Sequence, residues 1–169
     1  WWMFKIMGHQ NVFVLNGGLP DWIENKYPTE KIKYQQLESG NFQAQFESKN
    51  VKDMSFIKSN LNNENNLVID ARSSGRFNGS APEPREGLRS GHIPNSFNIP
   101  FGDVVDNGKF KSKEALKEIF SKVNPEKKEM IYSCGSGLTA CIILLASELI
   151  LPNKKAIYDG SWTEWAQLE

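Results

Sequence analysis

The stretch that decides the fold is residues 129–140, which read EMIYSCGSGLTA. An apolar run ends at Cys134, two glycines follow within three residues, and residues 138–151 then carry one charge, Glu148. This pattern is typical of a buried strand, a tight glycine-rich loop and a buried helix. We therefore predict that a strand delivers Cys134 to the N-terminus of a helix.

Cys134 occupies a position in which such a loop stabilises an anion. Inward-pointing loop N–H groups and the positive end of the helix dipole meet there, and the thiolate form of cysteine is an anion. Most free cysteines are small buried hydrophobic residues, but a plain core position has no use for the flanking Gly135 and Gly137. Our hypothesis is that Cys134 is a nucleophile.

The composition bounds the class of protein. A chain of 169 residues suffices for one domain with a core, and its formal net charge of zero gives no indication of a nucleic acid or membrane partner. No apolar run reaches transmembrane length, and the start is unlike a signal peptide. No cysteine or histidine cluster has metal-ligand spacing, so no metal is expected, and a reaction at a cysteine nucleophile implies no other cofactor.

The two cysteines, Cys134 and Cys141, are expected to be free thiols, because one is predicted in a loop and the other inside a helix. Free thiols indicate a reducing compartment. We therefore expect a cytoplasmic protein, with a mitochondrial location as the alternative.

The arginines are unevenly distributed. All four lie in residues 72–89, whereas none of the sixteen lysines falls between Lys58 and Lys109. The planar guanidinium group matches carboxylates and other oxyanions with two parallel hydrogen bonds. Apart from chance and surface ion pairs, this clustering indicates an anion-binding segment.

An internal repeat indicates the domain organisation. Residues 12–22 and 156–165 share an apolar run, Asn16 or Asp159, Gly17 or Gly160, and then an acidic residue and a tryptophan. We interpret residues 1–24 as the end of a first domain, residues 25–41 as a linker and residues 42–169 as a complete second domain of the same kind. Chance similarity between two strand–turn–helix segments is the alternative.

Strands and helices are predicted to alternate within the second domain. Expected strands are residues 42–46, 67–71, 96–100, 129–133 and 156–158; expected helices are residues 54–61, 113–123, 138–151 and 162–168, with Asp53 and Ser112 as caps. This order predicts an α/β fold with a mostly parallel sheet and helices on both faces. Loops at the carboxyl ends of parallel strands form the active crevice, so Cys134 and the arginine-rich loop 73–94 should meet.

Two chemistries suit a cysteine in such a loop. Phosphatases of the Cys-x5-Arg type need an arginine after five intervening residues, where this chain has Ala140, and residues 135–140 contain no cation. Sulfur transfer through a persulfide needs only donors around the sulfur and a cation for the anionic end of the substrate. The sequence favours sulfur transfer.

Several motifs together resemble the rhodanese family. The matching segments are VIDAR at 68–72, GRF at 75–77, PEPR at 82–85, SGHIP at 90–94, NIPF at 98–101, CGSGLTA at 134–140 and YDGSW at 158–162. The resemblance implies a rhodanese-like fold for residues 42–169, and it is compatible with residues 1–22 as the end of a first, non-catalytic rhodanese domain.

The resemblance also implies roles for individual residues. Cys134 would carry the persulfide, and Arg76 and Arg85 would bind the carboxylate and keto group of 3-mercaptopyruvate. The amides of residues 135–139 would line the sulfur cradle: Gly135, Ser136, Gly137, Leu138 and Thr139. A thiol such as thioredoxin, or cyanide, would accept the sulfur, and pyruvate would leave.

Ser136 and its neighbour bear on the sulfur donor. The resemblance implies that Ser136 joins a serine–histidine–aspartate relay whose other members belong to the first domain; a helix N-cap is its other possible role. Thiosulfate-type members resemble Cys-Arg-x-Gly, whereas Gly135 and Ser136 are neutral and suit a singly charged keto acid. Thiosulfate sulfurtransfer, a non-catalytic binding module and a fragment with little activity remain alternatives.

Four further residues are expected to be structural. His92 should make a hydrogen bond within its loop, and Asp70 should order the segment that follows it. Trp162 and Cys141 are expected to pack in the core.

Overall fold

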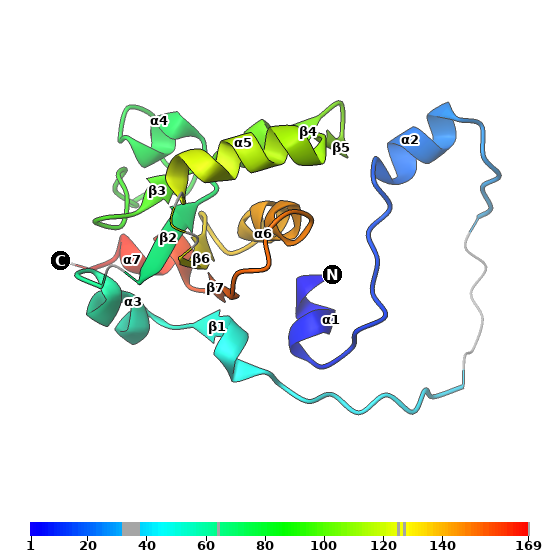
Figure 1. Ribbon diagram of the computed structural model, residues 1–169, viewed down its shortest axis with the longest axis horizontal. Helices are drawn as coiled ribbons and strands as arrows, with labels where there is room; N and C mark the ends of the chain where they lie inside the picture. The colour runs from blue at the N-terminus through cyan, green and yellow to red at the C-terminus, as the bar shows by residue number, and fades with distance from the viewer. Residues whose placement is uncertain (32–37, 64, 125, 127, 169) are drawn as a thin grey trace.

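A parallel five-stranded sheet forms the centre of the computed structural model, which describes residues 1–31, 38–63, 65–124, 126 and 128–168 (Figure 1). The strand order is β1-β7-β6-β2-β3, and every neighbouring pair is parallel. The strands are β1 (Val51–Lys52), β2 (Asn66–Asp70), β3 (Phe97–Asn98), β6 (Glu129–Ser133) and β7 (Lys155–Tyr158). This arrangement confirms the predicted α/β fold.

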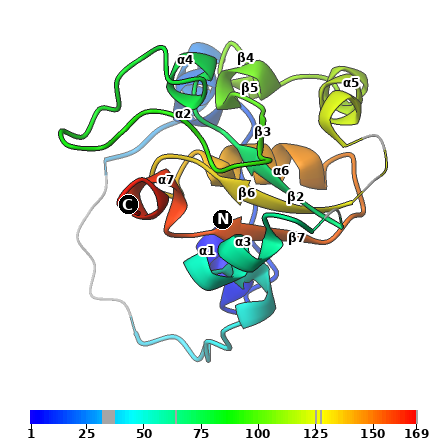
Figure 2. The ribbon, with the colours of Figure 1, turned by 90° about the vertical axis from the view of Figure 1, so that its left-hand side faces the viewer.

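Alternate side chains of the strands supply the two halves of the core. Ile69, Tyr132 and Ile157 face one cluster, to which α5 (Lys113–Val123) and α6 (Ala140–Glu148) contribute. Val68 and Ile131 face the other, built with α3 (Met54–Asn60) and α7 (Ser161–Trp165). Figure 2 shows helices above and below the sheet, as expected for a parallel sheet buried on both faces.

The helix starts follow local capping chemistry. The Asp53 carboxylate accepts a hydrogen bond from the Phe56 N–H at 2.8 Å, and the Ser112 hydroxyl accepts one from the Ala115 N–H at 3.2 Å. Both predicted caps are confirmed, because side-chain oxygens satisfy N–H groups that have no partner within a first helical turn. No helix in the described part of the chain is long and apolar enough to cross a membrane.

The remaining elements are short. They are α1 (Trp2–Ile6), α2 (Gly18–Glu24), η1 (Ser48–Asn50), α4 (Ser74–Phe77), η2 (Phe101–Val104) and the antiparallel hairpin of β4 (Val105–Asp106) with β5 (Lys109–Phe110). The sequence did not predict the hairpin, whose strands have two residues each. The predicted helix 162–168 is shorter than expected, since it ends at Trp165.

The prediction of an edge strand at residues 42–46 is wrong. Phe42 and Phe46 are more than half exposed, so the apolar side of this alternating segment is not buried against a sheet. The segment instead leads past α1, where the Gln45 N–H donates to the Met7 carbonyl at 2.9 Å. The edge of the sheet is β1, paired in parallel with β7.

Residues 1–24 only partly support the predicted repeat. A glycine turn at Gly17 is followed by α2, as Gly160 is followed by α7, but residues 12–15 form no strand and Phe13 is 88% exposed. Two contacts tie the segment to the hairpin: Lys109 pairs with Asp21 at 2.6 Å, and Asn16 accepts from the Phe110 N–H. Within the predicted linker, residues 32–37 lie outside the described residues.

Candidate active site

The cysteine loop and the arginine-rich segment leave the sheet side by side. Asp70 at the end of β2 lies in register with Ser133 at the end of β6. The Ala71 N–H then donates to the Ser133 carbonyl at 2.8 Å, which extends the pairing by one bond. The predicted meeting at the carboxyl ends of neighbouring parallel strands is therefore confirmed.

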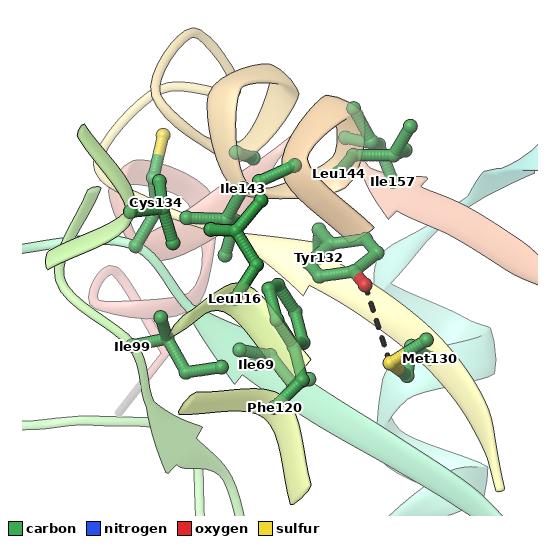
Figure 3. Close-up of a cluster of buried hydrophobic side chains, with 14 residues drawn as sticks. Ile69, Ile99, Leu116, Phe120, Met130, Tyr132, Cys134, Ile143, Leu144 and Ile157 are labelled. Atoms are coloured by element: carbon green, nitrogen blue, oxygen red, sulfur yellow. Dashed lines mark hydrogen bonds between the residues drawn. The ribbon is translucent and has the colours of Figure 1, made fainter. Parts of the chain in front are cut away.

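Cys134 sits at the rim of the core. Only 2% of the residue is exposed, and Figure 3 shows its sulfur directed away from the labelled apolar side chains. The start of α7 holds its backbone: its N–H donates to the Ser161 hydroxyl at 3.2 Å, and its carbonyl accepts from the Trp162 N–H at 2.9 Å. These contacts fix the direction in which the loop leaves the strand.

The loop after Cys134 presents a run of amides. No acceptor among the described residues meets the N–H groups of residues 135–139. Consecutive unpaired N–H groups at a helix start form a concave surface that attracts an anion. The geometry suits the predicted sulfur cradle, because the run begins directly after the cysteine and ends at α6.

Gly137 gives the cradle its shape. It has φ of +86°, and a Cβ at this position would lie 3.3 Å from both the carbonyl and a carboxylate oxygen of Asp159. A side chain would therefore combine a disfavoured backbone conformation with crowding against the turn that precedes α7.

We expect Gly137→Ala to destabilise the protein by about 1–3 kcal/mol, because alanine adopts a left-handed backbone only with strain. Urea unfolding followed by tryptophan fluorescence would measure the change. Gly102→Ala is the matched control, since Gly102 has open space around its missing Cβ and no positive φ. Equal stability of both variants would contradict the role assigned to Gly137.

A pocket of about 240 Å³ opens over the loop. Arg76 and Arg85 line it together with Cys134, Gly135, Ser136, Leu138, Thr139, Glu83, Pro84, Leu88 and Thr163. Of the residues predicted for the site, only Gly137 is absent from this lining, and it is buried beneath. The structure thus brings the predicted residues to one place.

Arg76 lies against the loop itself. A Cβ on Gly135 would be 2.9 Å from Nη2 of Arg76, so a side chain at residue 135 would displace the guanidinium group from this position. Arg85 is exposed and reaches the pocket from the outer side, where its Nη1 lies 3.5 Å from the Thr163 hydroxyl. The Thr163 hydroxyl in turn donates to the Gly135 carbonyl at 2.6 Å.

A chain of four charges stands behind the pocket. The Arg72 guanidinium is buried; it donates to Asp70 at 2.6 Å and to Glu83 at 2.7 Å, and it stacks on the Trp162 ring. Glu83 also accepts from Nη2 of Arg76 at 2.5 Å and from its Nε at 3.1 Å. The expected ordering role of Asp70 is borne out by these bonds.

The sequence analysis did not predict a role for Glu83. It lies between two prolines in a long loop, where an acidic residue is usually solvated. A faint signal existed: four arginines within eighteen residues need counter-charges if any of them is buried. Nothing in the sequence indicated that Arg72 would be the buried one.

Burial alone would raise the pKa of Glu83, but the hydrogen bond from Arg76 and the charges of both arginines outweigh it. The pKa of Glu83 is therefore held below its ordinary value of 4.5. A lowered carboxylate pKa contributes stability above the unfolded-state pKa, and this contribution is lost as the pH falls through the folded-state value.

We expect the free energy of unfolding to fall as the pH drops below about 4.5 and through the lowered pKa of Glu83, because Glu83 becomes protonated and releases its arginines. In Glu83→Gln the acid limb should be shallower, since the titrating group is absent. Urea titrations at stepped pH would measure both slopes. Glu86→Gln, which removes an exposed acid three residues on, should keep the wild-type slope; identical slopes in all three proteins would contradict this account.

Of the other residues singled out from the sequence, Ser136 and Leu138 are exposed at the pocket, whereas His92 has a structural role. Ser136 is exposed, makes no hydrogen bond to a described residue and is not the N-cap of α6, a position held by Thr139. The Leu138 side chain is also exposed. His92 Nδ1 lies 2.9 Å from the Phe77 carbonyl oxygen, and the imidazole ring stacks on the Phe77 ring. These contacts confirm the predicted structural role of His92.

Cys141 packs beneath the loop, with its Sγ 3.5 Å from the Gly137 carbonyl. Burial raises the pKa of this thiol to about 11, and the nearby Cys134 adds to the effect. Both cysteines are free. Among the described residues, no group of three or more histidine, cysteine or acidic side chains could hold a metal ion.

Known proteins are similar to this chain in sequence and in fold. Residues 53–168 match the family described as a rhodanese-like domain. Mouse 3-mercaptopyruvate sulfurtransferase is 40% identical over 167 residues, which cover 98% of this chain and 56% of that protein. Thiosulfate/3-mercaptopyruvate sulfurtransferase 1, mitochondrial, of Arabidopsis thaliana is 39% identical over 188 residues, or 98% of this chain and 50% of that protein.

A solved structure has the same fold as this chain. The crystal structure of SseA from Escherichia coli, described with the rhodanese fold and mechanism of 3-mercaptopyruvate sulfotransferases, aligns with a TM-score of 0.81 and 35% identity. The alignment covers 96% of this chain and 60% of that one. The chain thus spans about half the length of the curated relatives that it matches. Because the family model matches most of its residues and its fold is that of a solved rhodanese structure, the chain belongs to the rhodanese family.

Proposed function

We propose that the protein is a sulfurtransferase that moves sulfur from 3-mercaptopyruvate, through a persulfide on Cys134, to a thiol or to cyanide. The observation that carries the proposal is the pocket in which Cys134, the unpaired loop amides, Arg76 and Arg85 converge. The names of the mouse and Arabidopsis relatives support the choice of donor.

In the first step the Cys134 thiolate attacks the thiol sulfur of 3-mercaptopyruvate. A sulfur–sulfur bond forms and the carbon–sulfur bond breaks, with its electron pair passing to the methylene carbon. The resulting pyruvate enolate takes up one proton and leaves as pyruvate. Arg76 and Arg85 would bind the carboxylate and keto oxygen and stabilise the enolate charge.

In the second step an acceptor thiolate attacks the outer sulfur of the persulfide. That sulfur leaves with the acceptor, and the Cys134 thiolate is regenerated as the leaving group. The amides of Gly135, Ser136, Gly137, Leu138 and Thr139 would stabilise the sulfur anion in both steps. Thioredoxin is the proposed protein acceptor, because its reactive group is a thiol.

Ser136 is proposed to help move the proton of the donor thiol. Its exposed hydroxyl lines the pocket and is not used by another described residue, so it is available to a substrate. Thiosulfate as the main donor is the second candidate, favoured by the name of the Arabidopsis relative, which includes both donors.

The domain organisation belongs to the same proposal. We propose that residues 1–24 end a first rhodanese domain, that residues 25–41 link the domains and that residues 42–169 form the catalytic one. Exposed Phe13, Val14 and Leu15 support this, since apolar side chains in such a run normally have a partner surface. Two free thiols favour a reducing compartment, for which we propose the cytoplasm, with mitochondria as the alternative.

Mass spectrometry after brief incubation with 3-mercaptopyruvate tests the reaction, with thiosulfate in a parallel sample. The expected result is a gain of one sulfur atom on the peptide that contains Cys134, reversed by cyanide. A gain with thiosulfate alone would favour the second candidate. If neither donor adds sulfur, to this chain or to a longer chain with residues added before Trp1, the proposed function is wrong.

A further inference from the structure

The charged side chains of the pocket differ in whether an opposite charge pairs with them. The ionisable side chains that line the pocket are Arg76, Glu83, Arg85 and Cys134. Glu83 accepts two hydrogen bonds from Arg76, whereas Arg85 donates to the neutral Thr163 hydroxyl. Among the described residues that line the pocket, Arg85 is therefore the uncompensated cation, and the arginines and Glu83 together carry one net positive charge.

Glu83 is held beside Arg76 by burial and by a second arginine. Its side chain is 2% exposed, and its Oε1 also accepts from Nη1 of Arg72 at 2.7 Å. Arg72 is itself fixed by Asp70 and by the Gly91 carbonyl, which accepts from its Nη2 at 2.7 Å. These contacts hold the carboxylate beside Arg76.

Net charge of this kind discriminates between anions by their valence. A singly charged keto acid matches the single net positive charge of the two arginines and Glu83. A doubly charged anion brings one negative charge more than these groups can compensate, in a partly buried site beside the Cys134 thiolate. Sulfur donors differ in this respect: 3-mercaptopyruvate carries one negative charge and thiosulfate carries two.

We propose that Glu83 is a specificity-determining residue that favours singly charged sulfur donors by cancelling the charge of Arg76. This inference rests on the proposed function. Glu83 acts as a positioning residue, since it works through Arg76. The same bonds aim Arg76 at Gly135, so Glu83 sets both the place and the effective charge of that group.

Two variants should change donor preference in opposite directions. Glu83→Gln raises the pocket charge by one, so the ratio of kcat/KM for 3-mercaptopyruvate to that for thiosulfate should fall about tenfold or more. Arg85→Gln lowers the pocket charge by one. It should raise the same ratio, because the doubly charged thiosulfate loses more electrostatic attraction than the singly charged 3-mercaptopyruvate. Arg85 is exposed, so its replacement tests the selection by pocket charge, on which the role of Glu83 depends, even if Glu83→Gln fails to fold.

The matched control is Glu86→Gln, which makes the same chemical change on an exposed residue outside the pocket lining. Its ratio should stay within about twofold of wild type. Because both donors are assayed on the same protein sample, the ratio does not depend on the fraction that is folded. Ratios unchanged in both pocket variants would overturn the proposal.

A binding measurement separates this inference from the proposed function. Pyruvate and sulfate, with one and two negative charges, should each slow alkylation of Cys134 by iodoacetamide, which requires no turnover. Glu83→Gln should strengthen protection by sulfate relative to pyruvate about tenfold. If the wild type transfers no sulfur but this shift occurs, the proposed function fails and the charge selection stands; if sulfur is transferred but neither ratio shifts, the charge selection fails.

Discussion

Cys134→Ser should lower the rate of pyruvate release from 3-mercaptopyruvate at least about 1,000-fold, because a hydroxyl cannot form the persulfide. The structure supports a specific effect. Cys134 is buried at the rim of a well-packed cluster, and serine differs from cysteine by one atom, so the loop should keep its position. Pyruvate would be measured with lactate dehydrogenase, with cyanide as the sulfur acceptor.

Cys141→Ser is the control for this experiment. Cys141 is the other thiol of the chain, lies close to the same loop and has a raised pKa that keeps it protonated. This variant should retain most of the activity and the whole mass gain of one sulfur atom. Activity of Cys134→Ser above a tenth of the wild-type rate would mean that another group carries the sulfur.

Arg72→Met should destabilise the fold by about 3–5 kcal/mol, the usual cost when one partner of a buried ion pair is removed. The substitution keeps much of the side-chain length but leaves Asp70 buried without its guanidinium partner. It also removes one of the two arginines that hold Glu83, so Arg76 should become less well fixed. Chemical denaturation followed by circular dichroism would give the change in unfolding free energy.

Arg89→Met is the matched control, because the Arg89 guanidinium lies over the same Trp162 ring but its side chain is exposed. A loss of at most about 1 kcal/mol is expected there. Equal losses in both variants would show that stacking on Trp162, and not the ion pairs of Arg72, accounts for the stability.

The parts of the fold that the sequence predicts well are those encoded locally. The apolar run before Cys134, the glycines after it and the charge-poor segment beyond give β6, the loop and α6 almost without competing interpretations. The caps Asp53 and Ser112 fix two further helix starts, because capping depends on residues three positions apart.

Prediction from the sequence failed for the features that depend on contacts between distant parts of the chain. Residues 42–46 alternate like a strand, but β7 pairs with Val51 and Lys52 instead, and no local rule distinguishes the two segments. Glu83 and the buried Arg72 are paired through contacts that span eleven residues of irregular loop. The α7 side of the site, with Ser161 and Thr163, was missed for the same reason.

The strand order has a consequence for synthesis on the ribosome. β1, near residue 51, pairs with β7, near residue 157, and β7 separates it from every other strand of the sheet. Within this sheet, β1 is made first and must therefore remain without its partner while about 100 further residues are made. Sheets closed by such distant pairings form slowly and leave strand edges open in the meantime. We expect the nascent chain to depend on chaperones until β7 has left the exit tunnel.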